Sequence, residues 1–186
     1  MSGRDTRHRL PVGSAWGEID SPVGPLGVVV TPVGLLCLGF CSFASLAGAF
    51  ATPDGSDAGP VPLLGHGLGA QVAQELREYF SGQRKNFTVP IDWSLTSGVQ
   101  RSILATLRAE VPYGSTVGYG DLALLAGRTL GASRLVGTVM GGNPVAIVVP
   151  CHRVIAAGGA IGGFGGGLEA KRWLLTLEGA LPPTLF

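Results

Sequence analysis

Val149-Pro-Cys-His-Arg-Val-Ile155 is the stretch from which the rest of this 186-residue chain is best understood. It continues the apolar run Val145–Val149, which predicts a short buried strand that the proline ends. Cys151 and His152 come next, and a later helical stretch ends at Glu178. A thiol, an imidazole and a carboxylate are the groups that an activated thiolate nucleophile needs. The stretch therefore predicts a reactive cysteine at the end of a strand.

The composition fits a folded protein of one domain or two small ones. Hydrophobic residues make up 46% of the chain and charged residues 13%, so an apolar core can form. No apolar run approaches the roughly 18 residues that a membrane-spanning helix needs, and we expect no membrane partner. The basic start, residues 2–9, is followed by Pro11, Gly13 and Glu18 rather than by an apolar segment. This argues against a secretory signal and favours a cytoplasmic location.

The three cysteines, Cys37, Cys41 and Cys151, are an odd number and do not suggest a disulfide framework. They favour a reducing compartment. Cys37 and Cys41 lie in an apolar run, and we interpret them as buried, inert thiols. A zinc site is the alternative, but only His8 and His66 are available to complete it. We therefore expect no metal.

The net charge of +1 excludes a strongly basic nucleic-acid-binding protein. Residues 91–186 nevertheless hold seven Arg and Lys against five Asp and Glu, and six of those seven are arginine. Arginine is suited to phosphate contacts, so this half is the better candidate for a DNA-contacting surface. A solvated basic face would give the same counts, so the indication is weak.

Residues 14–90 predict a small α/β unit rich in strands. Its expected elements are strands at 28–30 and 35–40, a mobile Gly/Pro-rich loop at 51–67, a helix at 68–80 and an edge strand at 87–91. The turn residues between the first two strands favour a hairpin or meander. Nothing in this half forms a convincing catalytic set.

Residues 91–181 predict a second, mostly helical unit. Apolar residues at helical spacing predict helices at about 96–110, 120–126 and 132–140. The last two are joined by a short glycine-containing connection, which is typical of a helix-turn-helix. An ordinary packed pair of helices would give the same pattern, so the spacing alone leaves both interpretations open.

Several stretches of this second unit match one family. They are Val111-Pro-Tyr-Gly114, Val117-Gly-Tyr119, Ala132-Ser-Arg-Leu-Val-Gly137, Gly142-Asn-Pro144, Ile147-Val-Val-Pro-Cys-His-Arg-Val-Ile155, Gly165-Gly-Gly-Leu168, Lys171-Arg-Trp-Leu-Leu175 and Glu178-Gly179. On these motifs the chain resembles the O6-alkylguanine-DNA alkyltransferases over about residues 90–181. Residues 16–89 match the variable N-terminal domain of that family only loosely.

The resemblance implies a reaction and its catalytic residues. The thiolate of Cys151 would attack the alkyl carbon on guanine O6 and keep the alkyl group as a thioether, so each molecule would act once. His152 would accept the thiol proton through a bridging water, and Glu178 would hold the other imidazole nitrogen. Tyr119 would donate a hydrogen bond to guanine N3. Neither a metal nor an organic cofactor is implied.

The resemblance also implies how DNA is bound. The target nucleotide must leave the base stack, and Arg134 would fill the gap that it leaves. The helix that carries Arg134 would enter the minor groove of double-stranded DNA. Asn143 would tie that helix to the active-site strand, although it could also be a simple helix cap.

The glycine-rich loop 158–167 is not a phosphate loop, because no Lys-Ser or Lys-Thr follows it. The resemblance implies that it walls the alkyl pocket. Phe164 would stand where many members have tyrosine, and Gly165 would offer only its backbone N–H to guanine O6. The backbone carbonyls of Val154 and Cys151 would read the amino group of the base.

These inferences together predict an α/β (α+β) protein. A ribonuclease H-like N-terminal domain would cover 14–90, and a winged helix-turn-helix domain would cover 91–181. We expect a monomer that repairs O6-alkylguanine in DNA by direct alkyl transfer. A lesion-binding protein without transfer and a DNA-binding regulator are the alternatives, and the complete set of Cys151, His152 and Glu178 favours transfer over both. A cysteine hydrolase would need partner residues that this chain lacks.

Overall fold

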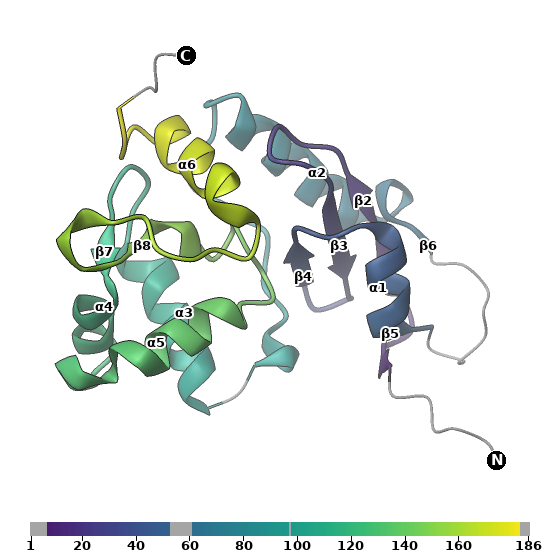
Figure 1. The fold of residues 1–186 in the computed structure, drawn as a ribbon. Helices are drawn as coiled ribbons and strands as arrows, with labels where there is room; N and C mark the ends of the chain where they lie inside the picture. The colour runs from purple at the N-terminus through teal and green to yellow at the C-terminus, as the bar shows by residue number, and fades with distance from the viewer. Residues whose placement is uncertain (1–6, 53–60, 97, 183–186) are drawn as a thin grey trace.

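The computed structural model of the chain describes residues 7–52, 61–96 and 98–182, and its elements form two neighbouring groups (Figure 1). The strands of the N-terminal half lie with two helices on one side, and the helices of the C-terminal half lie on the other. This arrangement confirms the predicted α/β class with a strand-rich N-terminal part and a helical C-terminal part. No helix in these ranges has the length and apolar character needed to cross a membrane.

The N-terminal half is organised around a four-stranded sheet in the order β4-β3-β2-β6. Strand β3 is antiparallel to both of its neighbours, and β6 runs parallel to β2. The elements of this half are β1 (His8–Arg9), β2 (Ala15–Ile19), β3 (Leu26–Val30), β4 (Leu35–Gly39), α1 (Phe43–Ala49), β5 (Phe50–Ala51), β6 (Val61–Pro62), a 3₁₀ turn (Leu63–Gly65) and α2 (Gly67–Phe80).

The sheet is covered on both faces. All five residues of β3 are buried, and successive side chains of a strand point to opposite faces. Val28 and Val30 belong to a core cluster with Leu76 of α2, whereas Val29 belongs to a second cluster with Leu46 of α1. Helices α1 and α2 therefore cover opposite faces of the sheet.

The structure of this half differs from the expected elements in two places. Helix α1 was not predicted, because it is only seven residues long, contains Gly48 and has no side-chain cap. The loop predicted at 51–67 is partly regular, since residues 61–65 form β6 and the 3₁₀ turn. Residues 53–60 of that loop lie outside the described residues.

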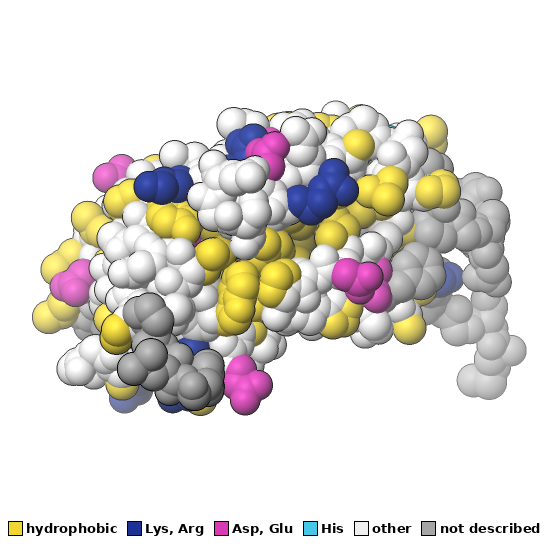
Figure 2. Space-filling model, turned by 90° about the horizontal axis from the view of Figure 1, so that it is seen from above, with side chains coloured by type: hydrophobic (Ala, Val, Ile, Leu, Met, Phe, Trp, Pro, Cys, Tyr) yellow, Lys and Arg dark blue, Asp and Glu magenta, His cyan; other side chains and the backbone are white. Residues whose placement is uncertain are grey.

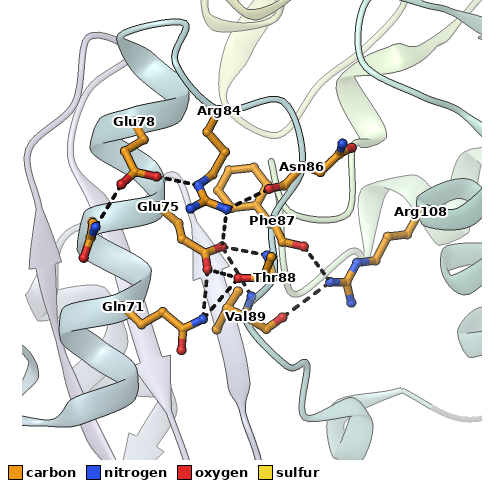
Figure 3. A network of polar contacts seen from close by, with 10 residues as sticks. Gln71, Glu75, Glu78, Arg84, Asn86, Phe87, Thr88, Val89 and Arg108 are labelled. Carbon is orange, nitrogen blue, oxygen red and sulfur yellow. Dashed lines mark hydrogen bonds and ion pairs between the residues drawn. The ribbon is translucent and has the colours of Figure 1, made fainter.

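The edge strand predicted at 87–91 forms only at its end, because residues 87–89 are fixed by side chains rather than by strand pairing (Figure 3). The carboxylate of Glu75 on α2 accepts hydrogen bonds from the backbone N–H groups of Thr88 at 2.8 Å and Val89 at 3.3 Å. The Arg108 guanidinium donates to the carbonyls of Phe87 at 3.3 Å and Val89 at 3.4 Å. Only Ile91 of the predicted strand makes a bridge to the sheet.

The C-terminal half is mostly helical, as predicted. Its elements are a 3₁₀ turn (Trp93–Leu95), α3 (Gly98–Glu110), β7 (Val117–Gly118), α4 (Tyr119–Leu125), a 3₁₀ turn (Leu130–Ala132), α5 (Ser133–Gly141), a 3₁₀ turn (Cys151–Arg153), β8 (Val154–Ile155), a 3₁₀ turn (Ala157–Gly159) and α6 (Gly167–Leu177). The three helices predicted before Cys151 correspond to α3, α4 and α5 with ends that differ by at most two residues. Helices α4 and α5 pack against each other across their short connection, which is the arrangement that the predicted helix-turn-helix requires.

The strand predicted at 145–149 is wrong in kind, although all five residues are buried as expected. The segment forms a tight turn in which the Val149 N–H donates to the Val145 carbonyl at 2.9 Å. Ile147 in this turn has a φ of 70°, a strained conformation for a β-branched residue. The apolar run reflects burial from all sides, which a short strand and a buried turn share.

The edge of β4 holds the two halves together. Leu38 on β4 donates its N–H to Pro144 and accepts from the N–H of Ala146, both at 2.8 Å. Leu35 makes equivalent backbone bonds to Pro90 at 2.8 Å and Asp92 at 3.0 Å. Residues 90–92, where the halves join, and residues 144–146 of the C-terminal half therefore occupy an edge that would otherwise expose unpaired backbone groups. They also place the turn before Cys151 against the N-terminal sheet.

Candidate active site

Cys151 opens the 3₁₀ turn that follows Pro150 and is 7% exposed. Its side chain lines a cavity of about 280 Å³. The cavity is small and four of its eight lining residues are glycine, so a compact group can approach the sulfur. The other residues that line it are Tyr119, Gly137, Met140, Gly141, Gly163, Phe164 and Gly165.

The structure brings His152 and Glu178 together in the interior. The Nε2 atom of His152 lies 2.9 Å from Oε1 of Glu178, and both side chains are fully buried. The other ring nitrogen, Nδ1, is buried without a hydrogen-bond partner among the described residues. Glu178 comes from the end of α6, on the face that also carries the buried Leu174. The helical repeat of α6 therefore aims the carboxylate inward.

Two further side chains that sequence reasoning left without a task bind the same carboxylate. Arg153 donates from Nε to Oε2 of Glu178 at 2.8 Å and from Nη2 to Oε1 at 3.0 Å. The hydroxyl of Tyr79 on α2 donates to Oε1 at 2.7 Å. Arg153 stands within the predicted motif. Tyr79 comes from the half in which no catalytic set was predicted, and no local pattern links it to Glu178.

These contacts determine the protonation states of the buried pair. Burial alone would raise the pKa of the Glu178 carboxyl, but hydrogen bonds from His152 and Arg153 outweigh burial and hold the pKa at about 2. Burial lowers the pKa of the His152 imidazole by more than the nearby carboxylate raises it. The resting pair is therefore an ionised carboxylate and a neutral imidazole. Nε2 must then carry the hydrogen, which leaves Nδ1 as the basic nitrogen.

The Cys151 thiol is protonated at rest. Burial raises its pKa, and this effect exceeds the lowering by a hydrogen bond from Asn143 and by the positive charge of Lys171. A thiol is a poor nucleophile compared with its thiolate. The sulfur therefore needs a base at the moment of reaction.

Asn143 clamps the turn that carries the thiol. Its amide Nδ2 donates to the Val149 carbonyl at 2.9 Å, and its Oδ1 accepts from the Val145 N–H at 3.1 Å. Both ends of the buried turn are thus tied to one side chain just after α5. Asn143 is more than a helix cap, because these bonds reach forward into the active-site segment.

Tyr119 is the first residue of α4, and Arg134 lies on α5. Tyr119 lines the Cys151 cavity and also a larger one of about 590 Å³, as does Gly137. Arg134 is exposed on α5 and lines only the larger cavity. The parallel pair β7 and β8 joins Gly118 to Ile155, which fixes the start of α4 beside the active-site segment. The structure thus links Arg134 to Cys151 through shared walls rather than through direct contact.

Phe164 and Gly165 close the opposite wall. The Phe164 ring packs edge-on against Phe40 at 5.1 Å between centroids and lies 6.4 Å from the His152 ring. A side chain at Gly166 would clash with Phe40, whose ring atoms would lie 2.6 Å from a Cβ atom there. Phe40 follows β4, so the N-terminal half supports this wall of the cavity.

Lys171 is fully buried and was not predicted as a site residue. Its Nζ donates to the Val154 carbonyl at 2.7 Å and to the Gly163 carbonyl at 3.4 Å. The Val154 carbonyl, expected to read the base, therefore also accepts a hydrogen bond from Lys171. Lys171 and Glu178 are seven residues apart on one face of α6, a spacing that could have indicated both.

Charge is spread thinly over the molecule. Figure 2 shows the molecule from above the view of Figure 1. On this face acidic and basic side chains are scattered around a central apolar area, and its described residues form no basic cluster. Within the described ranges, no group of three or more His, Cys, Asp or Glu side chains could hold a metal ion. Cys37 and Cys41 are free thiols, and burial raises the pKa of Cys37 to about 12.

The family comparison covers both halves of the chain. The ribonuclease-like domain of 6-O-methylguanine DNA methyltransferase matches residues 15–93, and the DNA binding domain of the same family matches residues 98–180. The chain therefore belongs to the 6-O-methylguanine DNA methyltransferase family. This result confirms the resemblance and extends it over the N-terminal half.

Individual relatives agree with this assignment. A methylated-DNA--protein-cysteine methyltransferase of Mycobacterium tuberculosis is 40% identical over 176 residues, which are 90% of this chain and 96% of that protein. An inducible enzyme of the same name from Bacillus subtilis is 45% identical over 106 residues, 57% of this chain and 58% of that protein. The crystal structure of Mycobacterium tuberculosis OGT in complex with DNA is similar with a TM-score of 0.74 and 35% identity, covering 89% of this chain and 92% of that one.

Proposed function

We propose that this protein repairs DNA by transferring an alkyl group from guanine O6 to the sulfur of Cys151. The observation that carries the proposal is the position of the Cys151 thiol at a cavity of about 280 Å³, next in sequence to an imidazole that Glu178 holds at 2.9 Å. The names of the relatives support the same reaction, since they are methylated-DNA--protein-cysteine methyltransferases. The partner is DNA, and the substrate is a duplex that contains O6-alkylguanine.

The first step is removal of the thiol proton. The neutral His152 offers Nδ1 as a base, because its Nε2 is committed to Glu178. A water molecule between Sγ and Nδ1 carries the proton, which leaves a thiolate beside an imidazolium. The ionised Glu178 stabilises that imidazolium through the Nε2 hydrogen bond.

The second step is alkyl transfer. The sulfur forms a bond to the alkyl carbon as the bond from that carbon to guanine O6 breaks, and the electron pair passes to the guanine. The Tyr119 hydroxyl donates a proton to guanine N3, so the base leaves neutral rather than as an anion. The imidazolium proton returns to the phenolate through solvent, which balances the charge. The thioether at Cys151 is stable, so each molecule reacts once.

The base reaches the sulfur by leaving the stack. Everting a nucleotide costs a few kcal/mol, and a side chain that fills the gap offsets part of this cost. Arg134 performs that task from α5, which lies in the minor groove of the duplex. Tyr119 and Gly137 line the path, because they belong to both cavities.

The cavity walls hold the base. The Gly165 backbone N–H binds guanine O6, and the Cys151 and Val154 carbonyls read the exocyclic amino group. Phe164 limits the size of the alkyl group. The protein acts as a monomer in the cytoplasm, where a free reactive thiol is kept reduced.

The test measures the DNA product. A duplex with one O6-methylguanine is incubated with the protein, digested, and assayed for restored guanine. The wild type restores up to one guanine per protein molecule, whereas Cys151→Ser restores none and still binds the duplex. Cys41→Ser removes a thiol that does not line the cavity, and this variant keeps full repair. Repair by Cys151→Ser would refute the proposal.

A further inference from the structure

We propose that Tyr79, a residue of the N-terminal half, is a positioning residue for alkyl transfer, because its hydroxyl holds the Glu178 carboxylate as the fixed acceptor of the His152 N–H. The proposal rests on the proposed function, since it assigns a task within that reaction. It gives the N-terminal half a direct part in the chemistry of the C-terminal half.

Tyr79 shares an acceptor atom with His152. The Tyr79 hydroxyl lies 2.7 Å from Oε1 of Glu178, and Nε2 of His152 lies 2.9 Å from the same oxygen. Tyr79 and Glu178 are 99 positions apart in the chain. Helix α2 brings the tyrosine to the end of α6, and the two helices are neighbours at the top of Figure 1. Any displacement of Oε1 therefore changes the length of both hydrogen bonds.

The direction of the Tyr79 hydrogen bond is unambiguous. An ionised carboxylate only accepts, so the tyrosine hydroxyl must donate. Burial raises the pKa of Tyr79, and the charge of Glu178 raises it further, so the phenol stays protonated. Donation to Oε1 stabilises the ionised carboxylate and so preserves the acceptor that fixes the Nε2–H tautomer of His152.

The ring of Tyr79 cannot swing away from this position. It is fully buried, and its centroid lies 5.2 Å from that of Phe87, 5.5 Å from that of Phe80 and 6.1 Å from that of Tyr113. Phe87 belongs to the segment that Glu75 and Arg108 fix between α2 and α3 (Figure 3). The hydroxyl is thus a preorganised donor at a set point in the interior.

Other charged and titratable groups surround the pair, and Tyr79 is the one uncharged hydroxyl among the described residues that donates to Oε1 of Glu178. Arg153 donates to both oxygens of Glu178 from the 3₁₀ turn, and to Oε1 at 3.0 Å. The positive charge of Lys171 on α6 lowers the pKa of His152, and the Tyr113 hydroxyl donates to the Leu177 carbonyl at 2.9 Å. Arg153 is a full positive charge that disfavours an imidazolium. Tyr79 is a neutral donor that reduces the negative charge on Oε1, so Glu178 stabilises the imidazolium less. This effect is smaller than that of Arg153, and it keeps His152 neutral down to a lower pH.

Tyr79→Phe tests the proposal, because it removes the hydroxyl and leaves the ring. The substrate is free O6-benzylguanine, which reacts without DNA binding, and the transfer rate is measured across pH. We expect the rate at neutral pH to fall about fivefold, the effect of losing part of one hydrogen bond to a charged group. We also expect the acid limb of the profile to move to higher pH, because the more basic carboxylate stabilises the imidazolium.

Tyr113→Phe is the matched control, since it removes a hydroxyl from the neighbouring ring without touching Glu178. It should leave the pH profile in place. A Tyr79→Phe profile that superimposes on the wild type, or that Tyr113→Phe reproduces, would overturn the proposal. The same wild-type preparation is first checked on an O6-methylguanine duplex, and failure to restore guanine there would instead refute the proposed function.

Nitrogen-15 NMR of His152 supplies a second readout that does not depend on the rate. The wild type should show the Nε2–H tautomer, with its midpoint of protonation at a lower pH than in Tyr79→Phe. The other histidines, His8 in β1 and His66 just before α2, serve as internal references. Identical His152 titrations in the two proteins would contradict the proposal even if Tyr79→Phe is less stable.

Discussion

Glu178 is the residue on which the buried polar cluster depends. Its carboxylate accepts from His152, Arg153 and Tyr79, and Oε2 also lies 3.3 Å from the Gly114 N–H. A buried charge of this kind is tolerated only when it is paired and fully hydrogen-bonded. The same bonds that stabilise it also set the tautomer of His152. Structure and chemistry therefore rest on one side chain.

The protonation of Glu178 makes stability depend on pH. The pKa of Glu178 is about 2 in the folded protein, against the ordinary value of 4.5 that applies to the unfolded chain. Between these two pH values the unfolded chain therefore binds a proton that the folded protein does not. Lowering the pH through this window favours unfolding. We expect this residue to account for about 1 kcal/mol of the stability lost between pH 6 and pH 3.5.

Urea unfolding at the two pH values measures this contribution. Glu178→Gln should lose less stability than the wild type between pH 6 and pH 3.5, whatever its stability at pH 6. Glu169→Gln removes an exposed carboxylate from the first turn of the same helix and should keep the wild-type difference. An unchanged difference in Glu178→Gln would show that the carboxylate does not titrate as described.

Some of these residues could be predicted from the sequence and others could not. Cys151 and His152 are adjacent, and Glu178 lies on the buried face of a periodic helix, so local pattern and family motif both indicate them. Tyr79 reads as an ordinary core residue at helical spacing. Its hydroxyl has a task only because the fold brings α2 to the end of α6, and such a contact leaves no local trace in the sequence.

At the scale of elements, the turn at 145–149 is the clearest failure of pattern reasoning. Five consecutive apolar residues indicate burial, and a strand is the usual form of a short buried run. The Asn143 side chain instead pins both ends of a turn whose centre, Ile147, has a φ of 70°. Strain of this kind persists where the surroundings impose it, and here it fixes the approach to the thiol.

Helix α5 makes the element-scale prediction. Arg134→Ala should slow transfer from an O6-methylguanine duplex by about tenfold or more, because the role proposed for Arg134 is to fill the gap that the everted base leaves in the stack. Transfer from free O6-benzylguanine should stay near the wild-type rate, since no base needs to be everted. Both rates are measured under single-turnover conditions.

Arg172→Ala provides the control, because it removes one exposed positive charge from α6 instead of α5. It should affect the two substrates alike and only slightly. If Arg134→Ala lowered both rates equally, Arg134 would have no special part in base eversion.

At the scale of the whole molecule, the two halves share one core. A single cluster of buried residues joins Val28 and Leu76 of the N-terminal half to Leu104 and Leu174 of the C-terminal half. The β4 edge and the Tyr79–Glu178 contact cross the same boundary. The division at about residue 90 remains a prediction from sequence, and the shared core argues that the halves are not independent in stability.

We therefore expect the two halves to unfold together. Trp16 lies in the N-terminal half, and Trp173 on α6 packs against Phe80 with ring centroids 5.7 Å apart. The variant that keeps only Trp16, with the others changed to phenylalanine, reports on the N-terminal half. The variant that keeps only Trp173 reports on α6 and its contact with α2. Their urea transitions should coincide, as for a two-state protein. Two transitions at different midpoints would show independent domains.

The most direct test of alkyl transfer to Cys151 is to measure the mass of the protein, and to locate any added mass, after reaction with excess substrate. The wild type is incubated with a several-fold excess of duplex O6-methylguanine, and intact-protein and peptide mass spectrometry locate the added mass. We predict a plateau at one methyl group per molecule, on the peptide that contains Cys151, with Cys37 and Cys41 unmodified. Methylation of another residue, or repair that continues beyond one lesion per molecule, would contradict the account.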